Sequence, residues 1–208
     1  MKKLAIMVLL AATASASAFA GDLYVVASIG RSDFDMQKSD IDDAIRAAGV
    51  TGINSSFDQY DTAYKVQVGY QFTEYFALEG GYVDLGKSKY SGSFSGGNGH
   101  GDIKASGANI VAVGILPLNE SFSVFGKLGL INAKVDSTVS VSGPGGSASA
   151  STSSTKGRAN WGFGATCHLS RQFAVRIEYE QFNKLGDDNT APKKFDAMLV
   201  SAGAVYKF

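Results

Sequence analysis

His168 and Ser170 are the two side chains whose types and spacing most suggest catalysis. In an extended strand, residues two apart lie on one face, and Glu178 or Glu180 downstream could orient the imidazole. A serine activated by a histidine is a nucleophile for hydrolysis. The pair, however, adjoins an expected tight turn, and both glutamates lie more than two rungs up the following strand. We therefore interpret His168 as a histidine at the end of a strand and Ser170 as a turn residue.

Residues that bind metals or cofactors are sparse. The single cysteine, Cys167, excludes an intramolecular disulfide and a thiolate cluster. The two histidines, His100 and His168, lie far apart and lack a carboxylate at ligand spacing. The run 96–101 is rich in glycine, but no helix follows it to bind a phosphate, so a flexible hairpin loop is the better interpretation. We expect no metal and no cofactor.

The first twenty residues have the pattern of an export signal. Lys2 and Lys3 precede an apolar run, Leu4–Ala12, that is too short to span a bilayer, and Ala18–Ala20 is a small-residue cleavage site. We expect residues 1–20 to be a cleaved signal peptide and residues 21–208, about 188 residues, to form one domain. That domain carries 17 basic and 19 acidic residues without a basic cluster, which argues against a nucleic-acid binder.

Apolar and polar residues alternate in eight segments between turn signals. In one of them Tyr64, Val66 and Val68 alternate with Lys65 and Gln67. This period indicates β-strands with two different faces. We place the strands at Asp22–Arg31, Tyr60–Phe72, Tyr75–Gly86, Lys104–Leu116, Phe122–Val135, Arg158–Leu169, Gln172–Asn183 and Asp196–Phe208.

The connections between these strands alternate between long and short. The long ones are residues 32–59, 87–103, 136–157 and 184–195, and the tight ones are Thr73-Glu74, Pro117–Ser121 and Ser170-Arg171. This asymmetry predicts an all-β fold: an eight-stranded antiparallel up-and-down transmembrane β-barrel with short periplasmic turns and four long extracellular loops. No apolar stretch in the mature chain is long enough for a membrane-spanning helix, so only a closed barrel could cross the bilayer.

Two of the long connections contain further signals. Ser39–Gly49 combines a capping serine, early acidic residues and a terminal glycine, which predicts a short helix with Ile41, Ala44, Ile45 and Ala48 on its apolar face. Its preferred interpretation is a local helix folded over the barrel rim, and the alternative is a helix that docks a partner. Ser142–Thr155 has low complexity and is expected to be flexible.

The last strand ends in aromatic residues. Met198, Val200, Ala202, Ala204, Tyr206 and Phe208 share one face. Exposed aromatic residues at the end of a strand are typical of the girdle at a membrane interface. We therefore assign Tyr206 and Phe208 to an aromatic girdle at the periplasmic end.

Four short motifs carry a family resemblance. They are Gly69-Tyr-Gln71, Glu79-Gly-Gly-Tyr82 with Asp84-Leu-Gly86, Arg176-Ile-Glu-Tyr179 and Tyr206-Lys-Phe208. Their order and strand phase resemble the OmpA-like eight-stranded outer-membrane barrel family over essentially the whole mature chain. The resemblance implies location in the cell outer membrane and makes Phe208 the expected recognition signal for the outer-membrane assembly machinery. Family members with the full pattern carry a peptidoglycan-binding domain, which we do not expect here.

The inward face of the strands is polar and charged. It comprises Lys65, Gln67, Gln71, Glu79, Asn109, Lys127, Thr166, Arg176, Glu178, Glu180 and Lys207. An eight-stranded barrel is just wide enough for side chains to fill, so charges inside it must be paired. We expect a lumen ion-pair network of Glu79, Arg176, Lys127, Glu178 and Lys65.

The family resemblance supports part of this network. It implies that Glu79 and Arg176 pair and that Lys127 is a further inward base. Val113 and Thr166, however, stand where the resemblance implies a lysine and a glutamate. Gating by exchange of ion-pair partners is therefore not carried over to this chain.

The favoured function is that of a non-enzymatic outer-membrane barrel with a structural role in envelope integrity and surface recognition through its extracellular loops. One alternative is a narrow porin-like small-solute channel. Another is a lipid A-modifying hydrolase, because His168-Leu-Ser170 resembles the H-x-S element of outer-membrane lipid A deacylases. Buried charges oppose a soluble lipocalin-like carrier. Expected partners are outer-membrane lipid and lipopolysaccharide, the assembly machinery, and an external ligand bound by the loops.

Overall fold

The computed structural model describes residues 21–36, 38–47, 49–187 and 194–208, so the predicted signal peptide lies outside the described residues. One helix and nine strands follow one another in this part of the chain. They are β1 (Asp22–Asp35), α2 (Lys38–Ala47), β2 (Asn54–Asp58), β3 (Tyr60–Thr73), β4 (Phe76–Phe94), β5 (Gly97–Pro117), β6 (Phe122–Gly143), β7 (Gly146–His168), β8 (Phe173–Leu185) and β9 (Phe195–Lys207).

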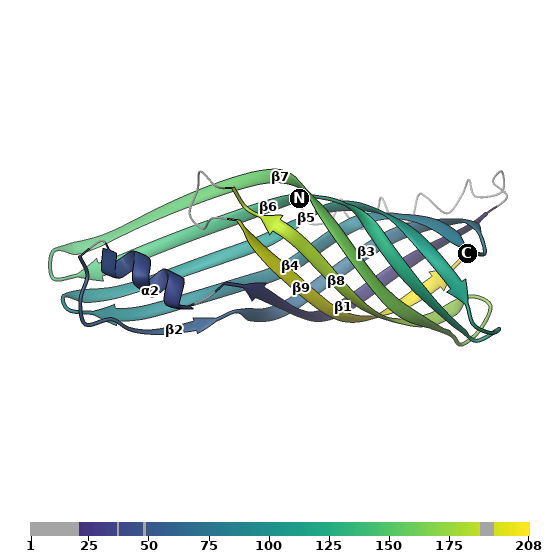
Figure 1. Cartoon of the computed structure of the whole chain (residues 1–208), viewed down its shortest axis with the longest axis horizontal. Helices are drawn as coiled ribbons and strands as arrows, with labels where there is room; N and C mark the ends of the chain where they lie inside the picture. The colour runs from purple at the N-terminus through teal and green to yellow at the C-terminus, as the bar shows by residue number, and fades with distance from the viewer. Residues whose placement is uncertain (1–20, 37, 48, 188–193) are drawn as a thin grey trace.

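All strands except the short β2 form a closed antiparallel ring. Each strand pairs with its neighbour in the chain, and β1 pairs with β9 from Tyr24↔Lys207 to Asp35↔Asp196. Closure leaves no unpaired strand edge within the ring. The predicted eight-stranded up-and-down barrel is confirmed, and its three tight turns and the C-terminus lie at the same end (Figure 1). We call this end, at the right of Figure 1, the lower end, and the opposite end the upper end.

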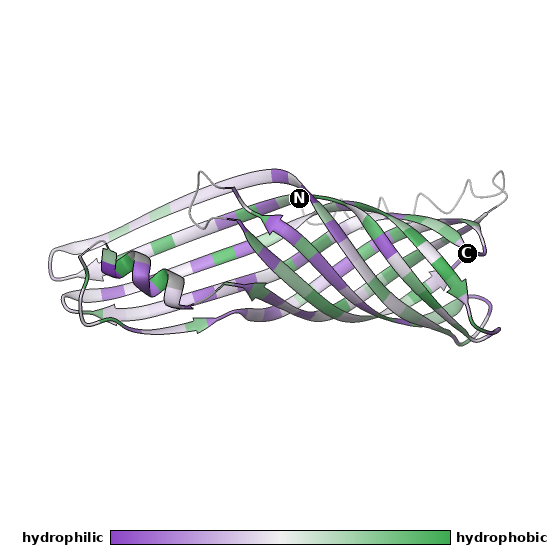
Figure 2. Ribbon diagram, in the orientation of Figure 1, coloured by the Kyte–Doolittle hydropathy of each residue, from purple (hydrophilic) through white to green (hydrophobic). Residues whose placement is uncertain are grey.

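The two faces of the barrel wall differ as the alternation predicts. In β3 the exposed fractions of Tyr64, Val66 and Val68 are 58%, 43% and 38%, whereas Lys65 and Gln67 are buried inside. Apolar residues therefore cover the outside of the barrel, and the polar residues of this strand lie inside, the reverse of a soluble protein. Figure 2 shows apolar colouring concentrated on the barrel and a paler, more polar surface at the opposite end.

Within the described residues no helix has the length and apolar character to cross a membrane.

Four strands continue well beyond the ring at the upper end. The β4–β5 ladder runs to Phe94↔Gly97 and the β6–β7 ladder to Gly143↔Gly146, which makes the molecule elongated (Figure 1). The long connections predicted at 87–103 and 136–157 are present as protruding segments, but they consist of paired strands that end in tight turns rather than of loops without secondary structure. Tight turns with positive φ at Gly96 and Gly146 let the polar chain fold back, and the paired strands then satisfy the backbone hydrogen bonds.

We call this protruding part, formed by β2 and the upper halves of β4, β5, β6 and β7, the extension. Its fifth strand, β2, pairs with β4 from Asn54↔Ser93 to Asp58↔Lys89. The extension is an open sheet, because β2 and β7 lie at its two sides. Its strands alternate between an inner face, continuous with the lumen, and an outer face.

Helix α2 is held against the inner face of the extension. It begins at Lys38, one residue before the predicted Ser39–Gly49 segment. Gly49, with a φ of 86°, ends it by donating its amide to the Arg46 carbonyl at 2.9 Å. The buried Asp42 carboxylate accepts hydrogen bonds from Lys38 at 2.8 Å and from Ser55 and Tyr90 at 2.7 Å. These contacts join α2 to β2 and β4. Of the predicted apolar face, Ala48 lies outside the described residues.

Apolar side chains fill the barrel interior at two levels. The lower apolar cluster comprises Tyr24, Val26, Ala77, Val111, Val113, Phe125, Ala174 and Val205. The upper apolar cluster comprises Phe34, Ala63, Val83, Leu85, Ala105, Ile131, Ala133, Val135, Phe182, Leu185, Phe195, Ala197 and Leu199. The polar layer of the lumen lies between them.

Candidate functional site

Six charged side chains meet between the two apolar clusters. They are Lys65 on β3, Glu79 on β4, Lys127 on β6, and Arg176, Glu178 and Glu180 on β8. We call them the charge layer. None is more than 6% exposed, because each lies at an inward position of its strand. The structure thus brings together all five residues of the expected ion-pair network and adds Glu180.

Glu79 has three side-chain partners in the lumen. Its Oε1 accepts hydrogen bonds from Arg176 at 2.6 Å and from the Tyr24 hydroxyl at 2.7 Å. Its Oε2 lies 2.6 Å from the Lys127 ammonium. Two cations and a phenol therefore hold this carboxylate, and charge-assisted hydrogen bonds of this kind are stronger than neutral ones.

Glu178 links the two halves of the layer. Its Oε2 lies 3.1 Å from Lys127, its Oε1 lies 3.4 Å from Arg176, and it also binds Lys65. Lys65 in turn binds Glu180. The six charges form one continuous network rather than separate pairs.

The layer contains three cations and three anions, so its formal charge is zero. Burying an unpaired ion costs several kcal/mol, and balance removes that cost only when every ion has partners. The Phe125 ring adds support from below, since the Arg176 guanidinium lies 4.6 Å and the Lys127 ammonium 5.3 Å from its centre. The geometry favours a fixed, neutral plug.

Tyr24 is the member of the site that sequence reasoning missed. It is 2% exposed, and its ring lies over Gly69, where a Cβ would overlap the ring atoms. The strand phase of Tyr24, Val26 and Ser28 places all three inward, and this signal could have identified it. Gly69 belongs to one of the short motifs, and close approach of the Tyr24 ring explains why a glycine occupies that position.

The two departures from the family pattern have clear surroundings. Val113 lies in the lower apolar cluster and is directly opposite Lys127 across the β5–β6 ladder. Thr166 is buried opposite Arg176 across the β7–β8 ladder. Neither position brings a charge to the layer.

The remaining expected lumen residues lie around the charge layer. Gln67 donates to the Asn109 amide oxygen at 3.4 Å, and both side chains are buried. Lys207 and Gln71 are half-buried, and the Lys207 ammonium donates to the Gln71 oxygen at 3.1 Å. All eleven residues assigned to the inward face therefore point inward or toward the lower mouth.

His168 and Ser170 are not assembled with a carboxylate. The His168 Nε2 lies 3.4 Å from the Ser123 hydroxyl, and the Ser170 hydroxyl accepts from the backbone amides of Gln172 and Phe173 at 3.3 Å and 3.0 Å. Glu178 and Glu180, which could have oriented the imidazole, bind Lys65 in the charge layer. Within the described residues no group of three or more His, Cys, Asp or Glu side chains could hold a metal.

Tyr206 and Phe208 lie in an aromatic group at the lower end. The ring centroid of Tyr206 is 5.0 Å from that of Phe173 and 5.1 Å from that of Phe208. Phe208 is 51% exposed, and its amide donates to the Leu23 carbonyl of β1 at 3.0 Å. Phe208 thus extends the β1–β9 seam.

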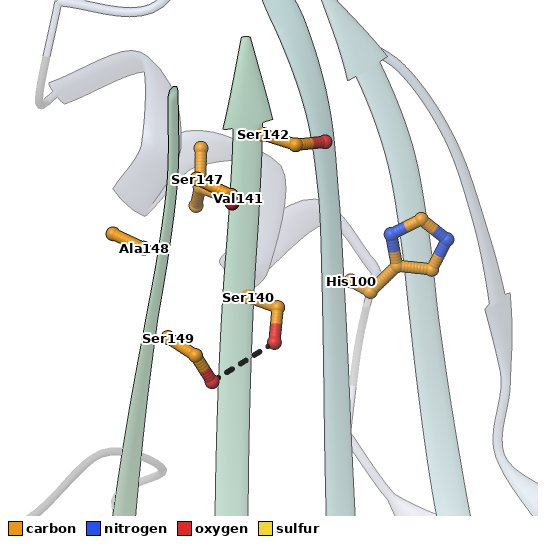
Figure 3. Close-up of a pocket in the computed structure, with 7 residues that line it drawn as sticks. All are labelled: His100, Ser140, Val141, Ser142, Ser147, Ala148 and Ser149. Carbon is orange, nitrogen blue, oxygen red and sulfur yellow. Dashed lines mark hydrogen bonds between the residues drawn. The ribbon is translucent and has the colours of Figure 1, made fainter. Parts of the chain in front are cut away.

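A shallow hollow of about 300 Å³ lies on the outer face of the extension. His100, Ser140, Ser142, Ser147 and Ser149 line it together with Val141 and Ala148, and the Ser140 and Ser149 hydroxyls are 3.1 Å apart (Figure 3). Hydroxyl and imidazole groups can donate and accept hydrogen bonds. The hollow can therefore hold a polar ligand.

Comparisons with known proteins give a consistent family. The protein-family model of the OmpA-like transmembrane domain matches residues 18–208. Outer membrane protein A of Salmonella typhi is 32% identical over 140 residues, which cover 67% of this chain and 38% of that protein. The protein of the same name from Shigella flexneri is 31% identical over the same shares. The chain thus matches well under half the length of these curated relatives.

Solved structures share the fold. OprG from Pseudomonas aeruginosa has a TM-score of 0.54 and 15% identity, covering 91% of this chain and 97% of that one. Ail of Yersinia pestis, in complex with the heparin analogue sucrose octasulfate, has a TM-score of 0.52 and 18% identity, covering 90% and 99%. Neisserial surface protein A has a TM-score of 0.51 and 14% identity, covering 89% and 97%.

Proposed function

We propose that this chain, which belongs to the OmpA-like transmembrane domain family, supports envelope integrity as a barrel with a closed lumen. It is an integral β-barrel of the cell outer membrane. One observation carries the proposal: the neutral charge layer lies between two apolar clusters inside the lumen. A solute would have to separate buried ion pairs and then cross both apolar levels. These barriers oppose the alternative of a porin-like channel.

Conduction tests the closed lumen directly. The purified protein is inserted into planar bilayers and into vesicles, with a general porin as the positive control. We expect no single-channel steps and no vesicle swelling in small sugars. Reproducible conductance by the wild-type protein would favour the channel. The envelope role predicts that loss of the gene sensitises cells to detergent and that the wild-type gene restores resistance.

The barrel surface contacts membrane lipid, and we propose a specific contact with lipopolysaccharide. Lys87, Lys89 and Lys134 are exposed and lie above the apolar outer surface of the barrel. Ammonium groups at this height could bind lipid phosphates. Replacing all three with glutamine should lower the amount of lipopolysaccharide that copurifies with the protein.

We also propose that Tyr206 and Phe208 are read by the outer-membrane assembly machinery. Their exposed rings at the β1–β9 seam support this role. Phe208→Ala should lower the inserted fraction in cells, whereas Phe122→Ala, which removes another exposed aromatic residue of the lower end, serves as the control. Equal insertion of both variants and the wild type would contradict the assignment.

We propose that the protein is not an enzyme and that residues 1–20 are an export signal. In the described part of the chain His168 contacts the Ser123 hydroxyl and Ser170 accepts from backbone amides, and neither hydrogen-bonds a carboxylate, which supports the first point. Lipid A from cells with wild-type protein and with Ser170→Ala should therefore have identical mass spectra. N-terminal sequencing of the membrane-bound protein should begin at Gly21.

Surface recognition is proposed at the upper end. The hollow formed by His100 and serine hydroxyls supports a ligand rich in hydrogen-bonding groups, such as a glycan. Ail, which shares the fold, was solved with a heparin analogue, although the hollow here has no lysine or arginine among its lining residues. Glycan-array binding that is lost in a Ser140→Ala, Ser149→Ala double variant would support this site.

A further inference from the structure

The upper half of β7 has an unpaired side. β7 pairs with β6 along its whole length, but it pairs with β8 only from Asn160 to His168. The segment 156–159 is partly covered, since Arg158 donates to the Gly186 carbonyl at 2.5 Å and Lys156 lies 3.0 Å from Asp187. Above it, Gly146–Thr155 has no strand partner on this side within the described residues. We call this segment the free edge.

The free edge lacks the features that normally prevent edge-to-edge pairing. Its ten residues are glycine, alanine, serine and threonine, with no charge and no proline. The β6–β7 register is continuous through it, so no bulge twists the edge away. The opposite side of the extension differs, because β2 is only five residues long and ends at Asp58. Alternate backbone amides and carbonyls of the free edge are therefore open to another strand.

The alternation of side chains makes the free edge self-complementary. Ala148 and Ala150 lie on the inner face, opposite Val141 and Val139 of β6, and Ser147, Ser149 and Ser151 lie on the outer face. A two-fold axis perpendicular to the sheet places the free edge of a second copy antiparallel to the first. The inner faces of the two copies then lie on one side of the joined sheet and the outer faces on the other. Serine then meets serine or threonine, and the small inner residues meet one another. With no charge along the segment, nothing repels the second copy.

The direction of the strands decides where that second copy must be. Copies in one membrane all present β7 in the same direction, so only parallel pairing, which is less stable per residue, is open to them. Antiparallel pairing requires a copy that points the opposite way. We propose that the free edge binds the free edge of a copy in a facing outer membrane, which makes the protein a homophilic contact between cells. The proposal rests on the outward position of the extension and is independent of the closed lumen.

Vesicle clustering tests this proposal. The full-length mature protein is inserted into two vesicle populations that carry different fluorophores, and clustering is followed by light scattering and energy transfer. We expect vesicles with the wild-type protein to cluster. A lysine at the free edge, introduced by Ala150→Lys or by Ser151→Lys, should lower clustering about tenfold. Thr138→Lys is the matched control, because it adds the same charge to the same sheet on the interior strand β6 and lies outside the hollow. A heat-modifiable shift on unboiled gels verifies that each variant is folded.

Cross-linking tests the antiparallel geometry. The test uses a Cys167→Ala background and two single-cysteine variants, Ala150→Cys and Ser151→Cys. Each variant probes the antiparallel register in which the two-fold axis passes through that residue, so that the cysteine lies opposite the same cysteine of the second copy. Disulfide dimers should join differently tagged proteins from separate vesicles, and Ser140→Cys should give none. Wild-type vesicles that do not cluster, edge variants that cluster normally, or dimers confined to one vesicle population would each overturn the proposal. If the wild-type protein conducted ions and its vesicles still clustered, the proposal of a closed lumen would fail and the contact between copies would stand.

Discussion

Glu79 and Arg176 illustrate how single side chains determine the properties of the lumen. Each is buried, and each depends on the other for charge balance, because the strand phase leaves no route to solvent. The sequence pattern places both inward, so their proximity is predictable. The Tyr24 hydroxyl is harder to foresee, since a tyrosine on a membrane strand is more often assigned to the lipid-facing side.

Arg176→Met should destabilise the folded barrel by about 3–5 kcal/mol, because it leaves Glu79 with one fewer cation in a buried site. Unfolding in urea, followed by the heat-modifiable gel shift, measures the change. Arg171→Met is the matched control, since Arg171 is exposed in a tight turn. Adding Glu79→Gln to Arg176→Met should restore part of the loss. A stability equal to wild type in the single variant would show that the network does not hold the barrel.

Gly69→Ala should destabilise the barrel by about 1–3 kcal/mol, because the new Cβ would overlap the Tyr24 ring and displace its hydroxyl from Glu79. Gly126→Ala is the matched control, since nothing lies within 4 Å of a Cβ built there. Both are glycine-to-alanine changes in strands, so they share the same backbone effect. The same urea titration compares them, and equal midpoints would exclude the steric explanation.

The strands show where sequence reasoning succeeds and where it fails. In the barrel, large apolar residues such as Tyr64 and Val66 alternate with polar ones, and lipid on one side makes that contrast strong. In the extension, water contacts both faces, so serine and threonine serve on either side and the contrast is weak. The only indication of a strand in this sequence is the short alternation of Val139 and Val141 with serines. Low complexity there reflects a two-sided polar sheet rather than a flexible loop.

Helix α2 should depend on pH through Asp42. Hydrogen bonds from Lys38, Tyr90 and Ser55 lower the pKa of the Asp42 carboxyl from its ordinary value of 3.8. The pKa of Asp42 is lower in the folded protein than in the unfolded chain. The stability that the ionised carboxylate gives to α2 is therefore complete above pH 3.8 and is lost as the pH falls through the folded-state pKa. Hydrogen exchange of the α2 amides, corrected for the intrinsic rate at each pH, should show protection that disappears under acid. Asp42→Asn should weaken protection at neutral pH and remove its acid dependence.

At the scale of the whole molecule, the barrel and the extension are joined by continuous strands but rely on different forces. The barrel is closed by ladders around the full ring and packed by two apolar clusters and the charge layer. The upper β6–β7 hairpin pairs on one side with β5 and contributes no residue above Ser137 to the buried core. Folding of the ring should therefore not require the end of that hairpin.

Replacing residues 138–151 with an Asn-Gly turn tests this independence. Ser137 and Thr152 are cross-strand partners, so the turn joins them in their native register and a two-residue hairpin suits the twist. We expect the folded, membrane-inserted fraction on unboiled gels to match wild type, because every contact of the charge layer remains. Vesicle clustering should be lost, since most of the free edge is gone. A shortened protein that fails to insert would show that the extension is needed to fold the barrel, and one that inserts and still clusters would place the contact between copies elsewhere.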